Sequence, residues 1–85
     1  MTHRIELRPA AVRALGTVET GARGRIQGAI ALLAENPRPP GARALHGRPG
    51  LRVRVGDYRI IYLVEDDVLL VVVVTPGHRR DVYHR

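Results

Sequence analysis

The chain has 85 residues, 45% of them hydrophobic, and a formal net charge of +6. This length predicts one small domain spanning residues 1–85, and the hydrophobic content excludes a disordered tail. Cysteine is absent, which excludes a disulfide framework and a thiolate metal site. The sequence has no apolar run long enough to span a bilayer and no signal-peptide layout at its start. We therefore expect a cytoplasmic protein that does not act at a membrane.

The positive charge is carried entirely by arginine, at 14 positions. Codon bias in a GC-rich genome explains most of the absence of lysine, but arginine also has chemical consequences. Its planar guanidinium group binds phosphate through two parallel hydrogen bonds and stays charged at any working pH. Between residues 38 and 59 only one acid, Asp57, accompanies six arginines, at positions 38, 43, 48, 52, 54 and 59. This basic stripe indicates nucleic acid or a strongly acidic protein as the partner.

The first half of the chain predicts a strand followed by two helices. Residues 2–8 alternate polar and apolar side chains, which is typical of a strand. Pro9 suits the first turn of a short amphipathic helix, whose apolar positions are Ala11, Ala14, Leu15 and Val18. We expect a second helix from about Gly21 to Glu35, capped by Thr20 and ended by Asn36-Pro37. Its predicted buried stripe is Ala22, Ile26, Ala29, Ile30 and Leu33.

The second half predicts an ordered surface loop and three strands. Residues 37–50 hold four of the six prolines, with Leu45 as the expected core anchor of this loop. Strands are predicted over residues 51–55, 58–64 and 68–75, with an acidic turn at residues 65–67. The order strand, helix, helix, strand, strand, strand defines an α+β fold. We expect the two helices to pack on one face of a small antiparallel sheet.

The turn at Gly56-Asp57 fixes the register of the first predicted hairpin. Glycine at the first central position of a two-residue loop suits a type II′ turn. Arg54 then lies opposite Arg59, and Arg52 lies on the same sheet face. Directly opposed like charges destabilise a sheet by ~0.2–1 kcal/mol per pair. Because stability alone does not favour this arrangement, it indicates a phosphate-binding site, although solvated strand residues are the simpler alternative.

Both faces of the predicted sheet are apolar. The helix-covered face is expected to hold Val53, Ile60, Tyr62, Val64, Leu69, Val71 and Val73, with Ile60 opposite Val73. The arginine-bearing face also carries Ile61, Leu63, Leu70, Val72 and Val74. Two helices can cover only one face, so either the C-terminal tail or another protein must cover the second.

Several motifs together resemble the RelE toxins of bacterial toxin–antitoxin pairs. They are the frame Leu51–Tyr62, the acidic turn with the valine-rich strand after it, and the tail Gly-His-Arg-Arg-Asp-Val-Tyr at residues 77–83. The likeness spans nearly the whole chain. It implies a toxin that enters the ribosomal A site and cuts mRNA without a cofactor, and an acidic antitoxin that binds it in a hetero-oligomer. The implied reaction is attack of a 2′-hydroxyl on the adjacent phosphate.

The resemblance also implies roles for individual residues. The basic positions of the family fall on Arg52, Arg54, Arg59 and Arg79, and the tail tyrosine falls on Tyr83. The family often has lysine at the first two, where one lysine is a candidate base. Arginine cannot lose its proton in a protein.

His78 is therefore the first candidate for the general base, because histidine titrates near neutrality. Tyr83 is expected to orient or stack on a nucleotide, with packing of the tail as the alternative. Arg43, Arg48 and Arg80 are expected to contact RNA without reacting, and His46 is interpreted as a loop hydrogen-bonding residue. No metal site is predicted, since the acids at residues 65–67 are typical of a turn.

Three functions stay open at this point. The first is the ribosome-dependent, metal-independent endoribonuclease. The second is a ParE-type toxin that inhibits DNA gyrase, whose relatives usually lack the arginine hairpin and the tail tyrosine. The third is a non-catalytic module that binds RNA or an antitoxin, which the absence of a lysine base keeps open.

Overall fold

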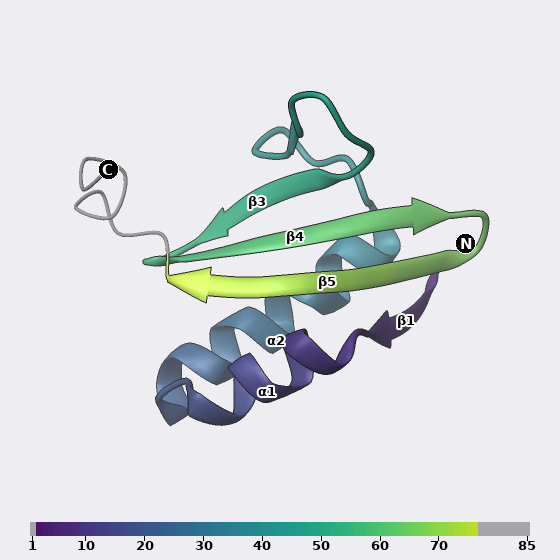
Figure 1. Ribbon diagram of the computed structural model, residues 1–85. Coiled ribbons are helices and arrows are strands. Elements are labelled where there is room, and N and C mark those ends of the chain that lie inside the picture. The colour runs from purple at the N-terminus through teal and green to yellow at the C-terminus, as the bar shows by residue number, and fades with distance from the viewer. Residues whose placement is uncertain (1, 77–85) are drawn as a thin grey trace.

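The computed structural model describes residues 2–76, so Met1 and residues 77–85 lie outside this description. Both helices lie on one side of a five-stranded sheet with the strand order β1-β5-β4-β3-β2 (Figure 1). This arrangement confirms the predicted α+β class with two helices on one sheet face. The elements are β1 (Arg4–Leu7), α1 (Pro9–Thr17), α2 (Thr20–Glu35), β2 (Arg43–Ala44), β3 (Leu51–Val55), β4 (Tyr58–Glu65) and β5 (Val68–Pro76).

The sheet is mixed, so the prediction of a purely antiparallel sheet is wrong in one respect. Strand β1 pairs in parallel with β5. The Arg4 amide donates to the Asp67 carbonyl oxygen at 2.7 Å, and the Arg8 amide donates to the Val71 carbonyl oxygen at 2.9 Å. Alternation of side chains indicates a strand but carries no information about the direction of its partner. The short strand β2, inside the predicted loop, was also missed because two residues show no periodicity.

Helix α2 begins one residue earlier than expected, and Glu19 caps it instead of Thr20. The Glu19 carboxylate accepts hydrogen bonds from the Gly21 amide at 3.0 Å and the Ala22 amide at 2.9 Å. The bonds from Ala22 and then Gly21 hold the pKa of Glu19 below its ordinary value. A carboxylate suits this place because the N-terminus of a helix carries partial positive charge. Threonine has the higher general preference for capping, which explains the wrong prediction.

Arg23 of α2 holds the end of α1. Its Nε donates to the Leu15 carbonyl oxygen at 2.9 Å, and its Nη2 donates to the Val18 carbonyl oxygen at the same distance. These carbonyls lie at the C-terminal end of α1, where the carbonyl oxygens lack the usual amide partners within the helix and the Leu15 oxygen accepts a bond of 3.2 Å from the Val18 amide as well. One side chain therefore completes the first helix and fixes its angle to the second.

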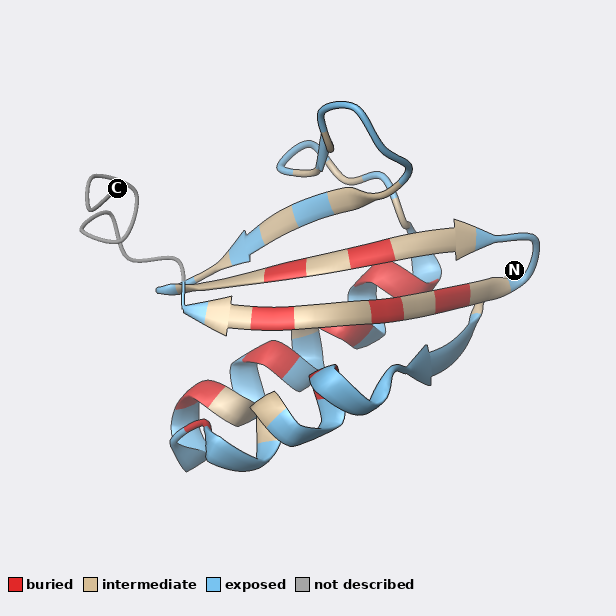
Figure 2. Cartoon of the chain, in the orientation of Figure 1, coloured by how far each residue is buried: buried red, intermediate tan, exposed pale blue. Residues whose placement is uncertain are grey.

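The hydrophobic core lies between the helices and the sheet (Figure 2). The predicted stripe of α2 is confirmed at Ala22, Ile26, Ile30 and Leu33, whereas Ala29 is half-buried. The largest fully buried side chains are Tyr62, Ile26, Ile60, Leu69 and Val71.

One face assignment on β5 was wrong. The register between β4 and β5 shifts between Ile61 and Tyr62, so Ile60 lies opposite Val74, not Val73. Tyr62 still lies opposite Val71, as a regular hairpin predicts. The shift inserts one extra residue into β5 and reverses the alternation after it. Val74 is therefore 4% exposed in the core, and Val73 lies on the arginine-bearing face.

Tyr62 connects the sheet to the loop that follows α2. Its hydroxyl group donates to the Pro37 carbonyl oxygen at 2.6 Å. Burial raises the pKa of Tyr62, and the positive charge of Arg38 opposes this rise. The bond holds the start of the segment that carries Arg43 and Arg48.

Candidate functional site

The β3–β4 hairpin has the predicted register. Gly56 has a φ of +58°, as the first central position of a type II′ turn requires. Arg54 lies opposite Arg59, and Arg52 lies opposite Ile61. Arg52 and Arg54 are exposed on the sheet face away from the helices, and Arg59 is half-buried there. The prediction that these three arginines share one face is confirmed.

Strand β2 adds a further arginine to this face by placing Arg43 opposite Arg52. The β2–β3 connection is closed by a hydrogen bond of 3.0 Å from the Leu45 amide to the Gly50 carbonyl oxygen. Gly47 and Gly50 have positive φ angles of 71° and 125°, which favour glycine. These two glycines were a sequence signal for the β2–β3 hairpin, which was not predicted.

Two adjoining cavities lie between these strands and the loop. The smaller, which we name the arginine cavity, has a volume of about 110 Å³ and is lined by Gly41, Arg43, Arg52, Val53, Arg54 and Arg59. The larger, which we name the histidine cavity, has a volume of about 280 Å³ and is lined by Ala44, Leu45, His46, Arg48, Arg52, Arg59 and Ile61. Both cavities include Arg52 and Arg59, so the fold brings five predicted site residues together. We name Arg43, Arg48, Arg52, Arg54 and Arg59 the arginine face.

Most of the charge on the arginine face is not neutralised by acids within residues 2–76. Within residues 2–76, ion pairs join Arg4 to Glu6 at 3.6 Å and to Asp67 at 4.0 Å, and neither of these pairs involves a residue of the β3–β4 hairpin. In the same range, Arg43, Arg48, Arg52 and Arg59 form no ion pair. Guanidinium groups so gathered repel one another, and an anion with several oxygens relieves the repulsion. The arrangement is suited to binding phosphate and to stabilising added negative charge on it.

The remaining predicted site residues, His78, Arg79, Arg80 and Tyr83, lie outside the described residues and stay predictions. The described chain ends next to the site, because Thr75 lies opposite Arg59 and Pro76 lies opposite Tyr58.

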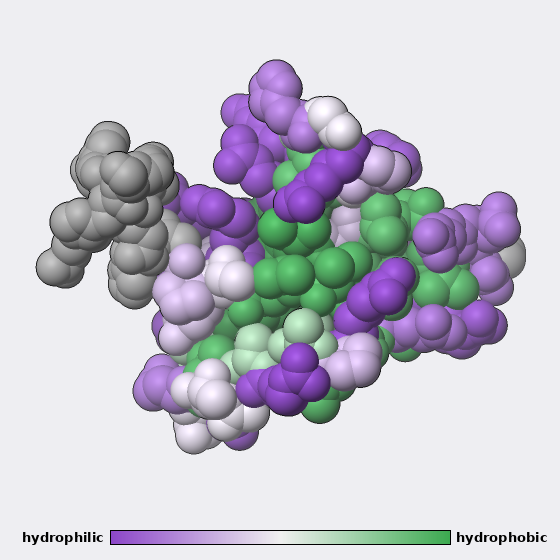
Figure 3. All heavy atoms as spheres, in the orientation of Figure 1, coloured by the Kyte–Doolittle hydropathy of each residue, from purple (hydrophilic) through white to green (hydrophobic). Residues whose placement is uncertain are grey.

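The arginine-bearing face also has an apolar part. Figure 3 shows hydrophobic side chains gathered over the strands, with hydrophilic side chains around them. Leu45 is half-buried here, beside Ile61 and Leu63, in a further cavity of about 160 Å³. The prediction that Leu45 anchors the core is wrong, because Leu45, directly after β2, lies with Ile61 and Leu63 on the face opposite the helices.

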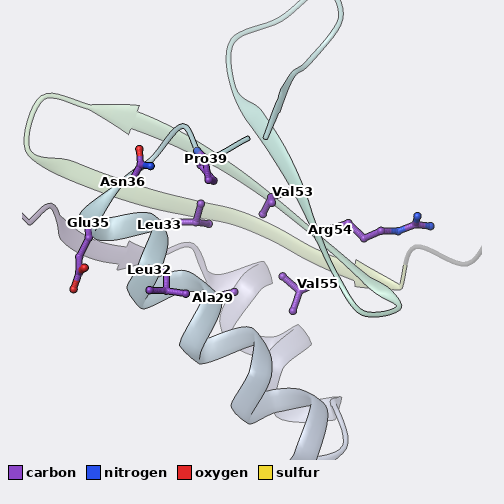
Figure 4. A pocket seen from close by; sticks show the side chains of 9 residues that line it. All are labelled: Ala29, Leu32, Leu33, Glu35, Asn36, Pro39, Val53, Arg54 and Val55. Atoms are coloured by element: carbon purple, nitrogen blue, oxygen red, sulfur yellow. The ribbon is translucent and has the colours of Figure 1, made fainter. Parts of the chain in front are cut away.

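A third hollow, the helix groove, lies between α2 and β3 (Figure 4). Its volume is about 340 Å³, and the side chain of Arg54 extends away from the other residues that line it. Leu32 is 67% exposed on its helix side. This groove was not predicted from the sequence, although the apolar Leu32, which lies outside the predicted stripe of α2, was a signal for it. The lining residues are Ala29, Leu32, Leu33, Glu35, Asn36, Pro39, Val53, Arg54 and Val55.

The described residues contain neither a cluster of metal ligands nor a membrane-spanning helix. Among residues 2–76, no group of three His, Asp or Glu side chains is placed to hold a metal ion. Asp66 and Asp67 form the turn between β4 and β5, and Asp66 has a φ of +55°. None of the helices in this part of the chain is long and apolar enough to cross a membrane.

Comparison with known proteins identifies the family of this chain. Residues 5–83 match the family described as the ParE toxin of type II toxin–antitoxin systems. The RelE–RelB complex of the archaeon Pyrococcus horikoshii contains a similar chain, with 28% identity over 93% of this chain and 99% of that one and a TM-score of 0.77.

The isolated RelE toxin of Escherichia coli is 22% identical over 95% of this chain and 90% of that one, with a TM-score of 0.80. For E. coli YafQ the identity is 16%, over 95% and 98% of the two chains, and the TM-score is 0.73. At these identities the likeness shows the shared fold. A search of curated protein sequences finds no match. Since the family match covers nearly the whole chain, the protein belongs to the ParE toxin family of the RelE/ParE superfamily and is a toxin of a type II toxin–antitoxin system.

Proposed function

We propose that this toxin is a ribosome-dependent, metal-independent endoribonuclease that cleaves mRNA. The observation that carries the proposal is the arginine face. It gathers five guanidinium groups around two adjoining cavities, and four of the five form no ion pair within residues 2–76. A toxin that acts only through protein contacts has no need of such a concentrated site for phosphate.

The reaction requires charge stabilisation and two proton transfers. The 2′-oxygen of one ribose forms a bond to the adjacent phosphorus, the bond from phosphorus to the 5′-oxygen breaks, and a 2′,3′-cyclic phosphate and a 5′-hydroxyl result. Arg52, Arg54 and Arg59 around the arginine cavity stabilise the added negative charge of the pentacoordinate phosphorus. Guanidinium groups do not accept the proton of the 2′-hydroxyl.

We assign the proton transfer to the residues after β5. His78 accepts the proton of the 2′-hydroxyl, because its unperturbed pKa lies near neutrality, and a water molecule supplies the proton that the departing 5′-oxygen gains. Arg79 and Arg80 add charge near the phosphate, and Tyr83 orients the nucleotide. The approach of β5 to Arg59 supports this assignment. Because the arginine face supplies charge but no base, we expect the ribosome to hold the substrate in its reactive geometry and free RNA to be cleaved weakly.

The proposed partner in the resting state is an acidic antitoxin. The similar chain of P. horikoshii occurs in a RelE–RelB complex. In this chain, the arginine face accepts carboxylates, and the helix groove and the apolar part of the sheet accept apolar side chains. One extended acidic protein that covers both kinds of surface would block the phosphate site and form a toxin–antitoxin hetero-oligomer.

Mapping of mRNA ends in a translating extract tests the proposal. Addition of the toxin is expected to produce codon-periodic cleavage inside reading frames, with 2′,3′-cyclic phosphate ends. Breaks in double-stranded DNA with intact message contradict the endoribonuclease and favour inhibition of DNA gyrase, the activity implied by the ParE name. Intact message and intact DNA contradict both and favour a non-catalytic module. Arg25→Ala, which removes an exposed arginine of α2, is the matched control for variants of the arginine face.

A further inference from the structure

We infer that the histidine cavity is a nucleobase subsite, in which His46 and Arg48 hold the base of the nucleotide next to the cleaved phosphate. This inference deepens the proposed function and rests on it. From the sequence, His46 was interpreted only as a loop hydrogen-bonding residue. The structure places it instead in a cavity that it shares with Arg52 and Arg59.

The walls of the histidine cavity suit a flat ring with polar edges. Leu45 and Ile61 supply apolar surface, while the imidazole of His46 and the guanidinium of Arg48 are planar groups. Histidine rings and guanidinium planes are among the groups on which RNA-binding proteins stack unpaired bases. A phosphate gains nothing from Leu45 and Ile61, because apolar walls leave its oxygens without partners.

The smaller cavity suits the phosphate of a nucleotide, and the larger cavity suits its base. The arginine cavity, of about 110 Å³, is dominated by guanidinium groups, whereas the histidine cavity has about 280 Å³ and mixed walls. Arg52 and Arg59 border both. A phosphate bound by these two arginines in the smaller cavity therefore has its own nucleotide within reach of the larger one.

The loop that carries His46 and Arg48 is fixed in place. The hydrogen bond from the Leu45 amide to the Gly50 carbonyl oxygen closes it, and the Ala44–Leu51 pair continues the closure into the sheet. A Cβ atom at Gly50 would lie 3.0 Å from the Leu45 side chain, so the two ends of the loop pack tightly against each other. Within residues 2–76, His46 makes no hydrogen bond that would hold its ring away from a ligand. A preformed loop loses little entropy when it binds a base.

Binding of RNA trinucleotides to the full-length toxin tests the inference. Each trinucleotide of the series lacks the base at one position, and the intact trinucleotide is the reference. For the unaltered toxin, we expect removal of one particular base to weaken binding about tenfold, as loss of one stacked base does. In His46→Ala the same removal is expected to change affinity less than about twofold, and His46→Tyr is expected to restore the dependence.

The controls separate this inference from the proposed function. His3→Gln, at a histidine whose ring contacts the Ala34 carbonyl oxygen away from the site, is expected to retain the dependence on the base. One outcome is that removal of any base weakens binding equally in the unaltered toxin and in His46→Ala, while the intact trinucleotide still binds and message is still cleaved. This outcome overturns the base subsite, and the endoribonuclease stands. If no RNA binds and no message is cleaved, both are overturned.

Discussion

One face of the sheet stabilises the fold, whereas the other face carries arginines whose mutual repulsion opposes folding. On the helix side, Ile60, Tyr62 and Val71 are fully buried, and each side chain is surrounded by other apolar groups. On the other side, Arg52 and Arg54 are exposed on strand β3, and Arg54 lies directly opposite Arg59. Alternation along a strand lets neighbouring residues serve different ends. Residues whose side chains point toward the helices stabilise the fold. The residues that alternate with them point to the opposite face and carry the proposed chemistry.

Truncation of a core residue is expected to have the largest effect on stability. Ile60→Ala removes a side chain that is 0% exposed and should lower the free energy of unfolding by about 2–5 kcal/mol. Urea denaturation measures this loss, with Arg52→Ala as the comparison on the exposed face. An equal loss for the two variants would contradict the division between the faces.

Truncation on the arginine face is expected to act on cleavage instead. Arg59→Ala should lower the rate of mRNA cleavage by about a hundredfold or more, because the variant removes a group that stabilises transition-state charge. Its melting temperature should stay near that of the unaltered toxin, because the variant also relieves repulsion with Arg54. The rate is measured from message ends in the extract, beside Arg25→Ala. Full cleavage by Arg59→Ala would remove this residue from the site.

Loss of the bond between the sheet and the loop is expected to have a smaller effect. Tyr62→Phe removes the donor to the Pro37 carbonyl oxygen and should lower the free energy of unfolding by about 0.5–1.5 kcal/mol. Hydrogen exchange should also increase in residues 37–50, because this bond holds the start of the loop. Exchange that increases equally in β5 would show a general loss of stability and contradict the specific role.

The smallest expected effect is the pH dependence of the α2 cap. The folded-state pKa of Glu19 lies below its ordinary value of 4.5, so its contribution to stability is present above that pH. The contribution is lost as the pH falls below 4.5 toward the folded-state pKa. The difference in melting temperature between the unaltered toxin and Glu19→Gln should therefore shrink as the pH is lowered through this range. A difference independent of pH would show that the charge of Glu19 does not contribute.

Features that neighbouring residues determine could be predicted from the sequence, whereas features that depend on the pairing of distant segments could not. The Gly56-Asp57 turn is local and fixed the register of Arg54 against Arg59, so that part of the site was predictable. The position of Val74 depends on a register shift that β4 and β5 make together, and no pattern within β5 alone reveals it. Arg43 belonged to the predicted basic stripe, but its place opposite Arg52 required pairing of a two-residue strand. The histidine cavity needed that same pairing, because it lies between β2, its loop and the sheet.

The salt dependence of RNA binding tests the central claim, that the arginine face binds the phosphates of RNA. For single-stranded RNA, each phosphate contact contributes a slope of about −0.7 to the plot of log affinity against log salt concentration. The account predicts that Arg52→Ala binds a short RNA more weakly and with a slope shallower by about 0.7, while Arg25→Ala keeps the slope of the unaltered toxin. An unchanged slope for Arg52→Ala would contradict it.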